Sequence, residues 1–87
     1  MPYEIEMYTT NPCPFCLAAK NLLQKRGLKW KEHLVFGGTP EWAAMMKRTN
    51  GKTVPQVIIN GEVIGGFPEL SALDKEDRLK ELANGRE

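Results

Sequence analysis

The sequence YEIEMYTTNPCPFCLAAKNLLQKRG at residues 3–27 contains an alternating segment, a pair of cysteines and an amphipathic segment. Residues 1–9 alternate apolar with acidic or polar side chains, which is the two-residue period of a strand with one buried face. Residues 14–26 repeat apolar positions at helical spacing and are followed by a glycine, which favours a helix end. The sequence therefore predicts a strand, a turn that carries Cys13 and Cys16, and a helix.

The remaining sequence continues to alternate strand and helix patterns. The predicted elements are a strand over 28–36 with Leu28, Trp30, Leu34 and Phe36 on its core face, a helix from Pro40 to Arg48 capped by Thr39, strands over 56–59 and 62–64 joined at Asn60-Gly61, and a helical tail over 68–83 with a break near Asp74. A strand-helix-strand start implies a parallel pair with a right-handed crossover, whereas a two-residue Asn-Gly turn implies an antiparallel hairpin. We therefore expect an α/β fold in the order β-α-β-α-β-β-α, with a four-stranded mixed sheet flanked by helices.

Length and charge narrow the classes of function. At 87 residues the chain is expected to form a single domain over 1–87. Its 12 basic and 11 acidic residues give a net charge of +1, which favours neither nucleic acid nor an anionic membrane as a partner. No apolar run approaches the roughly 20 residues that cross a bilayer, and no leader pattern opens the sequence. We expect a soluble, cytoplasmic monomer that acts on a small molecule or a protein.

Both cysteines of the chain lie at the predicted helix start, three positions apart. Pro14 suits the first helical position, so Cys13 is expected at the N-cap, with its sulfur facing the backbone N–H groups of Phe15 and Cys16. Such donors and the positive helix end favour thiolate over thiol. Cys13 is therefore the predicted nucleophile. Cys16 lies one turn inward, with a Cα separation of about 5–6 Å that a disulfide can bridge, and is the predicted resolving thiol.

Three other interpretations of the cysteine pair are open. A structural disulfide would need an oxidising compartment and would close a very short loop, which stabilises little. A zinc site needs four ligands, and besides the two cysteines the sequence contains one histidine, His33. Two unreactive core cysteines would leave Pro12 and Pro14 without a role. A redox pair fits the sequence better than any of these.

Three segments in this order resemble the dithiol glutaredoxins of the thioredoxin-like superfamily. They are Cys13-Pro14-Phe15-Cys16, then Thr53-Val54-Pro55 before a strand, then Gly65-Gly66-Phe67 before a helix. The resemblance implies a thioredoxin-like fold and a thiol-disulfide oxidoreductase that reduces protein disulfides and protein-glutathione mixed disulfides. Glutathione would then be the co-substrate that recharges the dithiol. Neither a tightly bound cofactor nor a metal is expected.

The resemblance also implies a glutathione site. Its expected residues are Phe15, Thr53, Val54, Pro55, Gly66, Phe67 and Arg48. The Val54-Pro55 bond is expected to be cis, with the backbone of Val54 pairing with the peptide. Three positions depart from the family pattern: Pro68 stands where relatives commonly have Asp, Thr10 stands where many have Lys, and Phe15 replaces the commoner Tyr.

Because Thr10 replaces the lysine of many relatives, any basic contact to the glycyl carboxylate of glutathione must come from another residue. Lys47, Arg48 and Lys52 precede Thr53 and are candidates, although a solvated helix end is the alternative role for each. Two other functions remain open. One is a carrier of a [2Fe-2S] cluster held by Cys13 and glutathione from each of two chains. The other is a thioredoxin-like reductant that a flavin reductase recharges.

Overall fold

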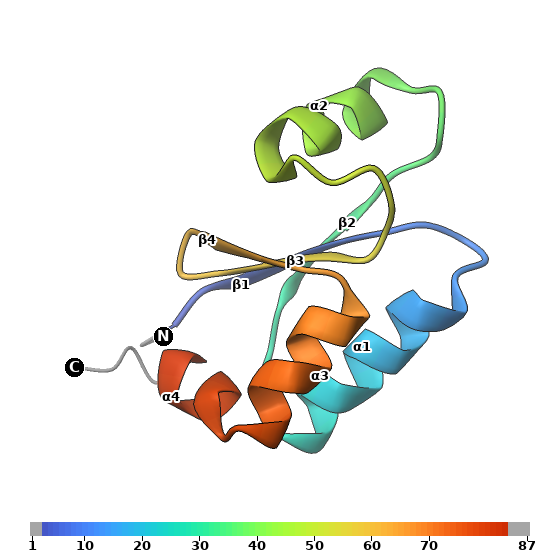
Figure 1. Cartoon of the computed structure of the whole chain (residues 1–87). Coiled ribbons are helices and arrows are strands. Elements are labelled where there is room, and N and C mark those ends of the chain that lie inside the picture. Colours follow the sequence, from blue (N-terminus) through green and yellow to red (C-terminus); the bar gives the residue numbers. More distant parts are fainter. Residues whose placement is uncertain (1–2, 84–87) are drawn as a thin grey trace.

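A four-stranded mixed sheet forms the centre of the computed structural model, which describes residues 3–83, the side chains of 80, 82 and 83 excepted (Figure 1). The elements are β1 (Ile5–Thr9), α1 (Pro14–Lys25), β2 (Lys31–Leu34), α2 (Pro40–Thr49), β3 (Gln56–Ile59), β4 (Glu62–Gly65), α3 (Phe67–Lys75) and α4 (Arg78–Ala83). The strands lie in the order β2-β1-β3-β4. β1 pairs parallel with β2 and antiparallel with β3, and β3 pairs antiparallel with β4. The predicted mixed sheet and its hairpin are confirmed.

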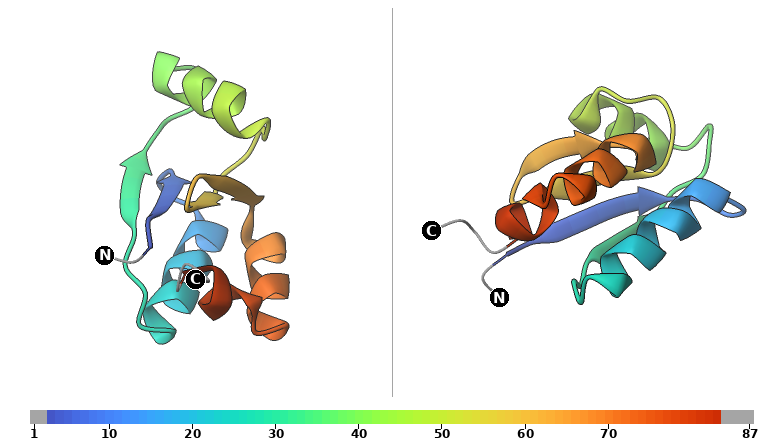
Figure 2. Two further views of the ribbon diagram at one scale, coloured as in Figure 1. Left: turned by 90° about the vertical axis from the view of Figure 1, so that its left-hand side faces the viewer. Right: turned by 60° about the horizontal axis from the view of Figure 1, so that its bottom comes forward.

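Helices cover both faces of the sheet. α1, α3 and α4 lie on one face, and α2 lies on the other (Figures 1 and 2). Side chains from the first face of the sheet and from its helices form the main core, which comprises Ile5, Met7, Ala19, Leu23, Leu28, Val57, Ile59, Leu70 and Leu79. Among residues 3–83, no helix is long and apolar enough to cross a membrane.

The alternation predicted for the first strand is confirmed from Ile5 onward, whereas residues 1 and 2 lie outside the described part. Ile5, Met7 and Thr9 are buried on the face that packs against α1, and Glu6 and Tyr8 are half-buried on the face below α2. A strand with this pattern separates two environments. Its inward face stabilises the core, and its outward face anchors α2.

The second strand is shorter than predicted, and its predicted core face is confirmed only in part, since Leu28 lies in the main core and Trp30 packs against it. β2 covers only Lys31–Leu34, and Leu34 and Phe36 are 49% and 48% exposed, whereas Val35 is buried. Because β2 is an edge strand, only part of its surface is covered by other elements. Val35, which follows the last residue of β2, is buried, and its N–H donates to the carbonyl oxygen of Thr9 at 2.8 Å.

The helical tail is divided farther along than predicted. α3 begins at Phe67 and ends at Lys75, and Asp77, with φ of 61°, separates it from α4. A left-handed residue ends a helix because the chain can no longer continue the helical hydrogen bonds. The predicted break in the tail is confirmed, but it lies at Glu76 and Asp77 rather than at Asp74, which is inside α3 and pairs with Arg26 beyond the end of α1. Leu79 of α4 is buried in the main core, and the side chain of Leu82 lies outside the described part.

Candidate active site

Cys13 is the N-cap residue of α1, as predicted. Its backbone is extended, with φ of −155° and ψ of 96°, and Pro14 occupies the first helical position. The N–H of Cys16 donates to Sγ of Cys13 at 3.1 Å. A helix start leaves N–H groups without partners inside the helix, so this bond directs one such donor at the sulfur. The same donor would stabilise negative charge on a Cys13 thiolate.

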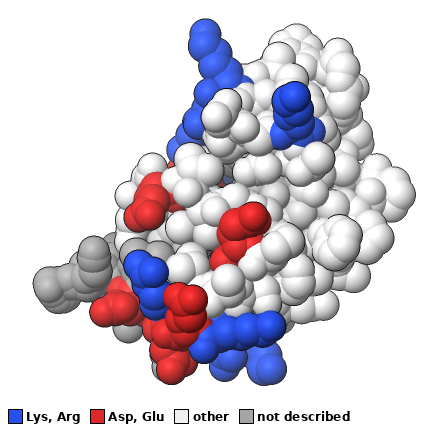
Figure 3. Space-filling view, in the orientation of Figure 1, with Lys and Arg blue, Asp and Glu red and all other residues white. Residues whose placement is uncertain are grey.

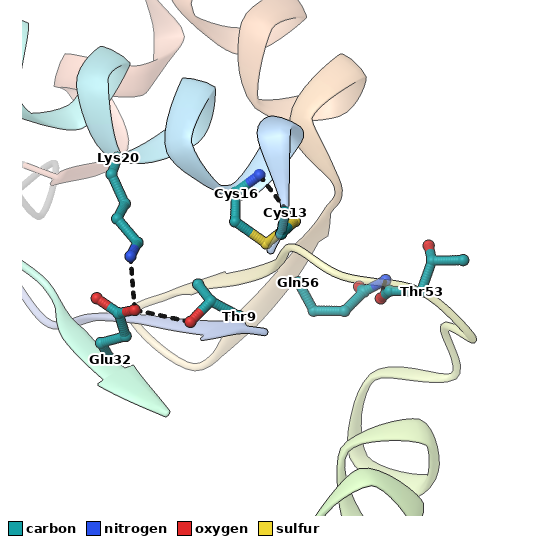
Figure 4. The surroundings of a disulfide bond; sticks show 7 residues. All are labelled: Thr9, Cys13, Cys16, Lys20, Glu32, Thr53 and Gln56. Carbon is teal, nitrogen blue, oxygen red and sulfur yellow. Dashed lines mark hydrogen bonds and ion pairs between the residues drawn. A yellow bond between two sulfur atoms is a disulfide. The ribbon is translucent and has the colours of Figure 1, made fainter. Parts of the chain in front are cut away.

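Cys13 and Cys16 form a disulfide, with their Cα atoms 5.2 Å apart (Figure 4). The separation matches the predicted range. The two residues differ in access, because Cys13 is half-buried whereas Cys16 is only 2% exposed. An incoming molecule can therefore reach the first sulfur more easily than the second.

Two other loops lie beside the cysteine motif. The rings of Phe15 and Phe67 are stacked with centroids 6.3 Å apart, which joins the start of α1 to the start of α3. A Cβ added to Gly66 would lie 3.4 Å from the carbonyl oxygen of Pro55, so the loop that contains Pro55 lies close to the start of α3. The Val54-Pro55 bond is cis, as the resemblance implied. The fold thus brings together three segments that are far apart in the sequence.

Thr53 and Pro55 differ in exposure within their loop. Thr53 is exposed and Pro55 is buried, and Val54 between them is half-buried. The carbonyl oxygen of Thr53 accepts a hydrogen bond of 2.8 Å from Nε2 of Gln56, the first residue of β3. This bond uses a buried side chain of the sheet to fix the loop.

Glu69 is a residue of this region that the sequence interpretation missed. The N–H of Gly66, the N-cap of α3, donates to Oε1 of Glu69 at 2.9 Å. Pro68 has no N–H, so the first turn of α3 presents one donor fewer than an ordinary helix start. A glutamate three residues after an N-cap is a known capping pattern, and this spacing could have indicated the contact.

Arg48, a candidate for the glycyl carboxylate, binds groups of the sheet. Its two terminal nitrogens donate to the carboxylate of Glu6 at 3.0 and 2.9 Å, and Nη1 also donates to the Tyr8 hydroxyl at 3.0 Å. Nε2 of His33 lies 3.0 Å from the same carboxylate. Hydrogen bonds from Arg48 and then from His33 lower the pKa of Glu6 to about 2. The predicted contact between Arg48 and glutathione stays a prediction, and the observed contacts join α2 to the sheet.

A second polar cluster that the sequence interpretation missed lies near the disulfide (Figure 4). Oε2 of Glu32 accepts a hydrogen bond from Oγ1 of Thr9 at 2.7 Å and lies 2.7 Å from Nζ of Lys20. Burial raises the pKa of Glu32, but the hydrogen bonds from Lys20 and Thr9 outweigh it, and the pKa is lowered. In the sequence, Glu32 was only an interruption of the apolar positions. A carboxylate at an inward position was the available signal for such a cluster.

Comparison with known proteins agrees with this geometry. The family model for glutaredoxin matches residues 5–64. The chain belongs to the glutaredoxin family. Glutaredoxin 3 of Escherichia coli is 38% identical over 78 residues, which cover 90% of this chain and 94% of that protein. As in that family, the chain is a thiol-disulfide oxidoreductase with a thioredoxin-like fold.

Solved glutaredoxin structures share the arrangement. The solution structure of glutaredoxin from Brucella melitensis superposes with a TM-score of 0.82 at 34% identity, covering 97% of this chain and 91% of that one. A buckwheat glutaredoxin in complex with glutathione superposes with a TM-score of 0.82 at 21% identity, covering 93% of this chain and 76% of that one. At 21% identity, the likeness to the buckwheat protein concerns the fold alone.

Proposed function

We propose that this glutaredoxin reduces protein disulfides and protein-glutathione mixed disulfides through Cys13 and Cys16, with glutathione as the recharging thiol. The single observation that carries the proposal is the unequal pair of sulfurs. Cys13 caps α1 and is partly accessible, whereas Cys16 is buried behind it. The glutathione complex of the buckwheat protein supports glutathione as the co-substrate.

The first step is attack by the Cys13 thiolate on a substrate disulfide. A bond forms between Sγ of Cys13 and one substrate sulfur while the substrate S–S bond breaks, and the departing thiolate takes up a proton. The N–H of Cys16, which donates to this sulfur in the disulfide, is placed to stabilise the thiolate before attack. The substrate is then held to the enzyme as a mixed disulfide.

Two routes release the substrate. In the dithiol route the Cys16 thiolate attacks Sγ of Cys13, which expels the substrate thiol and forms the intramolecular disulfide. In the monothiol route, glutathione attacks a mixed disulfide between Cys13 and glutathione and leaves as oxidised glutathione. Two glutathione molecules supply the two electrons that return the Cys13–Cys16 disulfide to the dithiol.

The proposed glutathione site is formed by the three loops around Cys13. Its residues are Phe15, Thr53, Val54, Pro55, Gly66 and Phe67, together with Arg48 of α2. The backbone of Val54 would pair with the peptide as an added strand does. The N-terminus of α3 would attract a carboxylate of glutathione, in competition with Glu69 for the N–H of Gly66. We also propose that the 87 residues act as one cytoplasmic, monomeric domain.

The test is glutathione-dependent reduction of a glutathionylated peptide by wild type, Cys13→Ser and Cys16→Ser. We expect no activity for Cys13→Ser and retained activity for Cys16→Ser, because the monothiol route needs only the first cysteine. Activity of Cys13→Ser would refute the assignment of the nucleophile. Failure of glutathione to recharge the wild type would refute glutathione dependence. The protein prepared without oxygen should be colourless, whereas a brown protein would favour the cluster carrier.

A further inference from the structure

Phe15 and Phe67 form an exposed aromatic pair beside Cys13. Phe15 is 62% exposed although it is a large apolar residue, and Phe67 is half-buried against the main core. Their rings are stacked with an interplanar angle of 29°. The ring of Phe15 therefore presents an apolar surface to solvent at the same end of α1 as the reactive sulfur.

The segments that surround this aromatic pair are mostly uncharged, although Glu69 in the first turn of α3 and Lys52 before Thr53 border them. Residues 7–19, 53–61 and 63–68 include no Asp, Glu, Lys, Arg or His. In Figure 3 the right-hand margin of the molecule, where α1 begins, shows no Lys, Arg, Asp or Glu, whereas acidic groups lie in the middle of this face and further charges lie at its top and bottom. For an uncharged polypeptide, apolar contact with this surface is then the main attractive force near Cys13.

We propose that the aromatic pair selects extended polypeptide substrates that carry an aromatic or large aliphatic residue next to the disulfide cysteine. This inference rests on the proposed reaction at Cys13. The occupant follows from continuity, because a protein disulfide that reaches Cys13 places its neighbouring residues over the surface of the same loop. A residue adjacent to the substrate cysteine can then cover the exposed face of Phe15 and remove apolar area from water.

The substrates for the test are two symmetric disulfide dimers of an uncharged tetrapeptide, acetyl-Gly-X-Cys-Gly-amide, with X either phenylalanine or serine. Reduced enzyme and peptide disulfide are mixed in single turnover without glutathione. Two electrons and two protons pass from Cys13 and Cys16 to the peptide, giving the enzyme disulfide and two peptide thiols. Liquid chromatography of the peptide thiol gives the second-order rate constant.

We expect wild type to reduce the phenylalanine dimer about fivefold faster than the serine dimer, within the roughly two- to twelvefold range of one aromatic contact. Phe15→Ser and Phe67→Ala should each bring this ratio below about two. Phe36→Ser is the matched control, because Phe36 is a 48% exposed phenylalanine on the connection between β2 and α2. Its ratio should equal that of wild type.

A wild-type ratio near one would overturn the inference, as would an unchanged ratio in both variants or a loss of preference in Phe36→Ser. Failure to reduce either peptide would instead refute the proposed dithiol chemistry. Because glutathione is absent, a defect in glutathione recharging leaves this measurement unaffected.

Discussion

Replacement of Glu6 by glutamine should destabilise the protein at neutral pH. The carboxylate of Glu6 accepts both terminal nitrogens of Arg48 and lies within hydrogen-bond distance of His33. A neutral amide keeps the shape of the side chain but loses the charge. The contact joins β1 to α2, whose end leads into the Thr53-Val54-Pro55 loop, so the change also loosens the support of the proposed glutathione site.

The size of the effect follows from the pKa of Glu6. A carboxylate whose pKa falls from 4.5 to about 2 would contribute at most roughly 3 kcal/mol at neutral pH. The side chain of Glu6 is 19% exposed and that of Arg48 is 42% exposed. Solvent screening therefore reduces the expected loss to about 1–2 kcal/mol in the free energy of unfolding.

Urea unfolding of wild type and Glu6→Gln at several pH values measures this loss. Because the pKa of Glu6 is lower in the folded state, its contribution is complete above about pH 5 and disappears as the pH falls to about 2. The difference between the two proteins should shrink over that window. Glu62→Gln, a substitution at an exposed residue of β4, is the control and should lie within about 0.5 kcal/mol of wild type. Equal stability of wild type and Glu6→Gln at pH 7, or a difference that does not change with pH, would refute the reasoning.

Three further substitutions test the surroundings of the site and the core. Lys20→Met should raise the pKa of Glu32, because the variant loses the Lys20 ammonium that lowers this pKa while the effect of burial, which raises it, remains. NMR titration of the Glu32 carboxyl group should show the rise. Lys31→Met, at an exposed position of β2, should not produce it. Gly65→Ala should cost about 1–2 kcal/mol in urea unfolding because Gly65 has φ of +119°, whereas Gly37→Ala, where an added Cβ meets open space, should change stability by less than about 0.5 kcal/mol. Leu23→Ala should lower the free energy of unfolding by about 2–5 kcal/mol since Leu23 is fully buried, and Leu17→Ala, at a 59% exposed position of the same helix, should have little effect; similar losses for both variants would contradict the assignment of the core.

Local patterns account for most of the fold that could be predicted. Three signals each depend on a few neighbouring residues: the alternation of apolar and polar side chains in β1, the proline at the start of α1, and the Asn-Gly turn. Asn60 and Gly61 have φ of 52° and 85°, the left-handed values that this dipeptide adopts in tight hairpins. The N-cap position of Cys13 was predictable for the same reason, because Pro14 restricts the residue before it.

Contacts between distant elements could not be predicted from local patterns. The exposure of Leu34 depends on the position of β2 at the sheet edge, which the alternation of its side chains does not reveal. The pairing of Arg48 with Glu6 and that of Lys20 with Glu32 likewise depend on how helices lie over the sheet. In both ion pairs the charged residues were visible in the sequence, but the partners are 42 positions apart for Arg48 and Glu6 and 12 positions apart for Lys20 and Glu32.

The central claim is that Cys13 is the accessible nucleophile and that Cys16 is held behind it. Fully reduced wild type treated briefly with iodoacetamide under native conditions, then digested and analysed by mass spectrometry, tests the claim directly. We predict that Cys13 is alkylated first and that Cys16 stays largely unmodified until the protein is unfolded. Alkylation of Cys16 as fast as, or faster than, that of Cys13 would contradict the account.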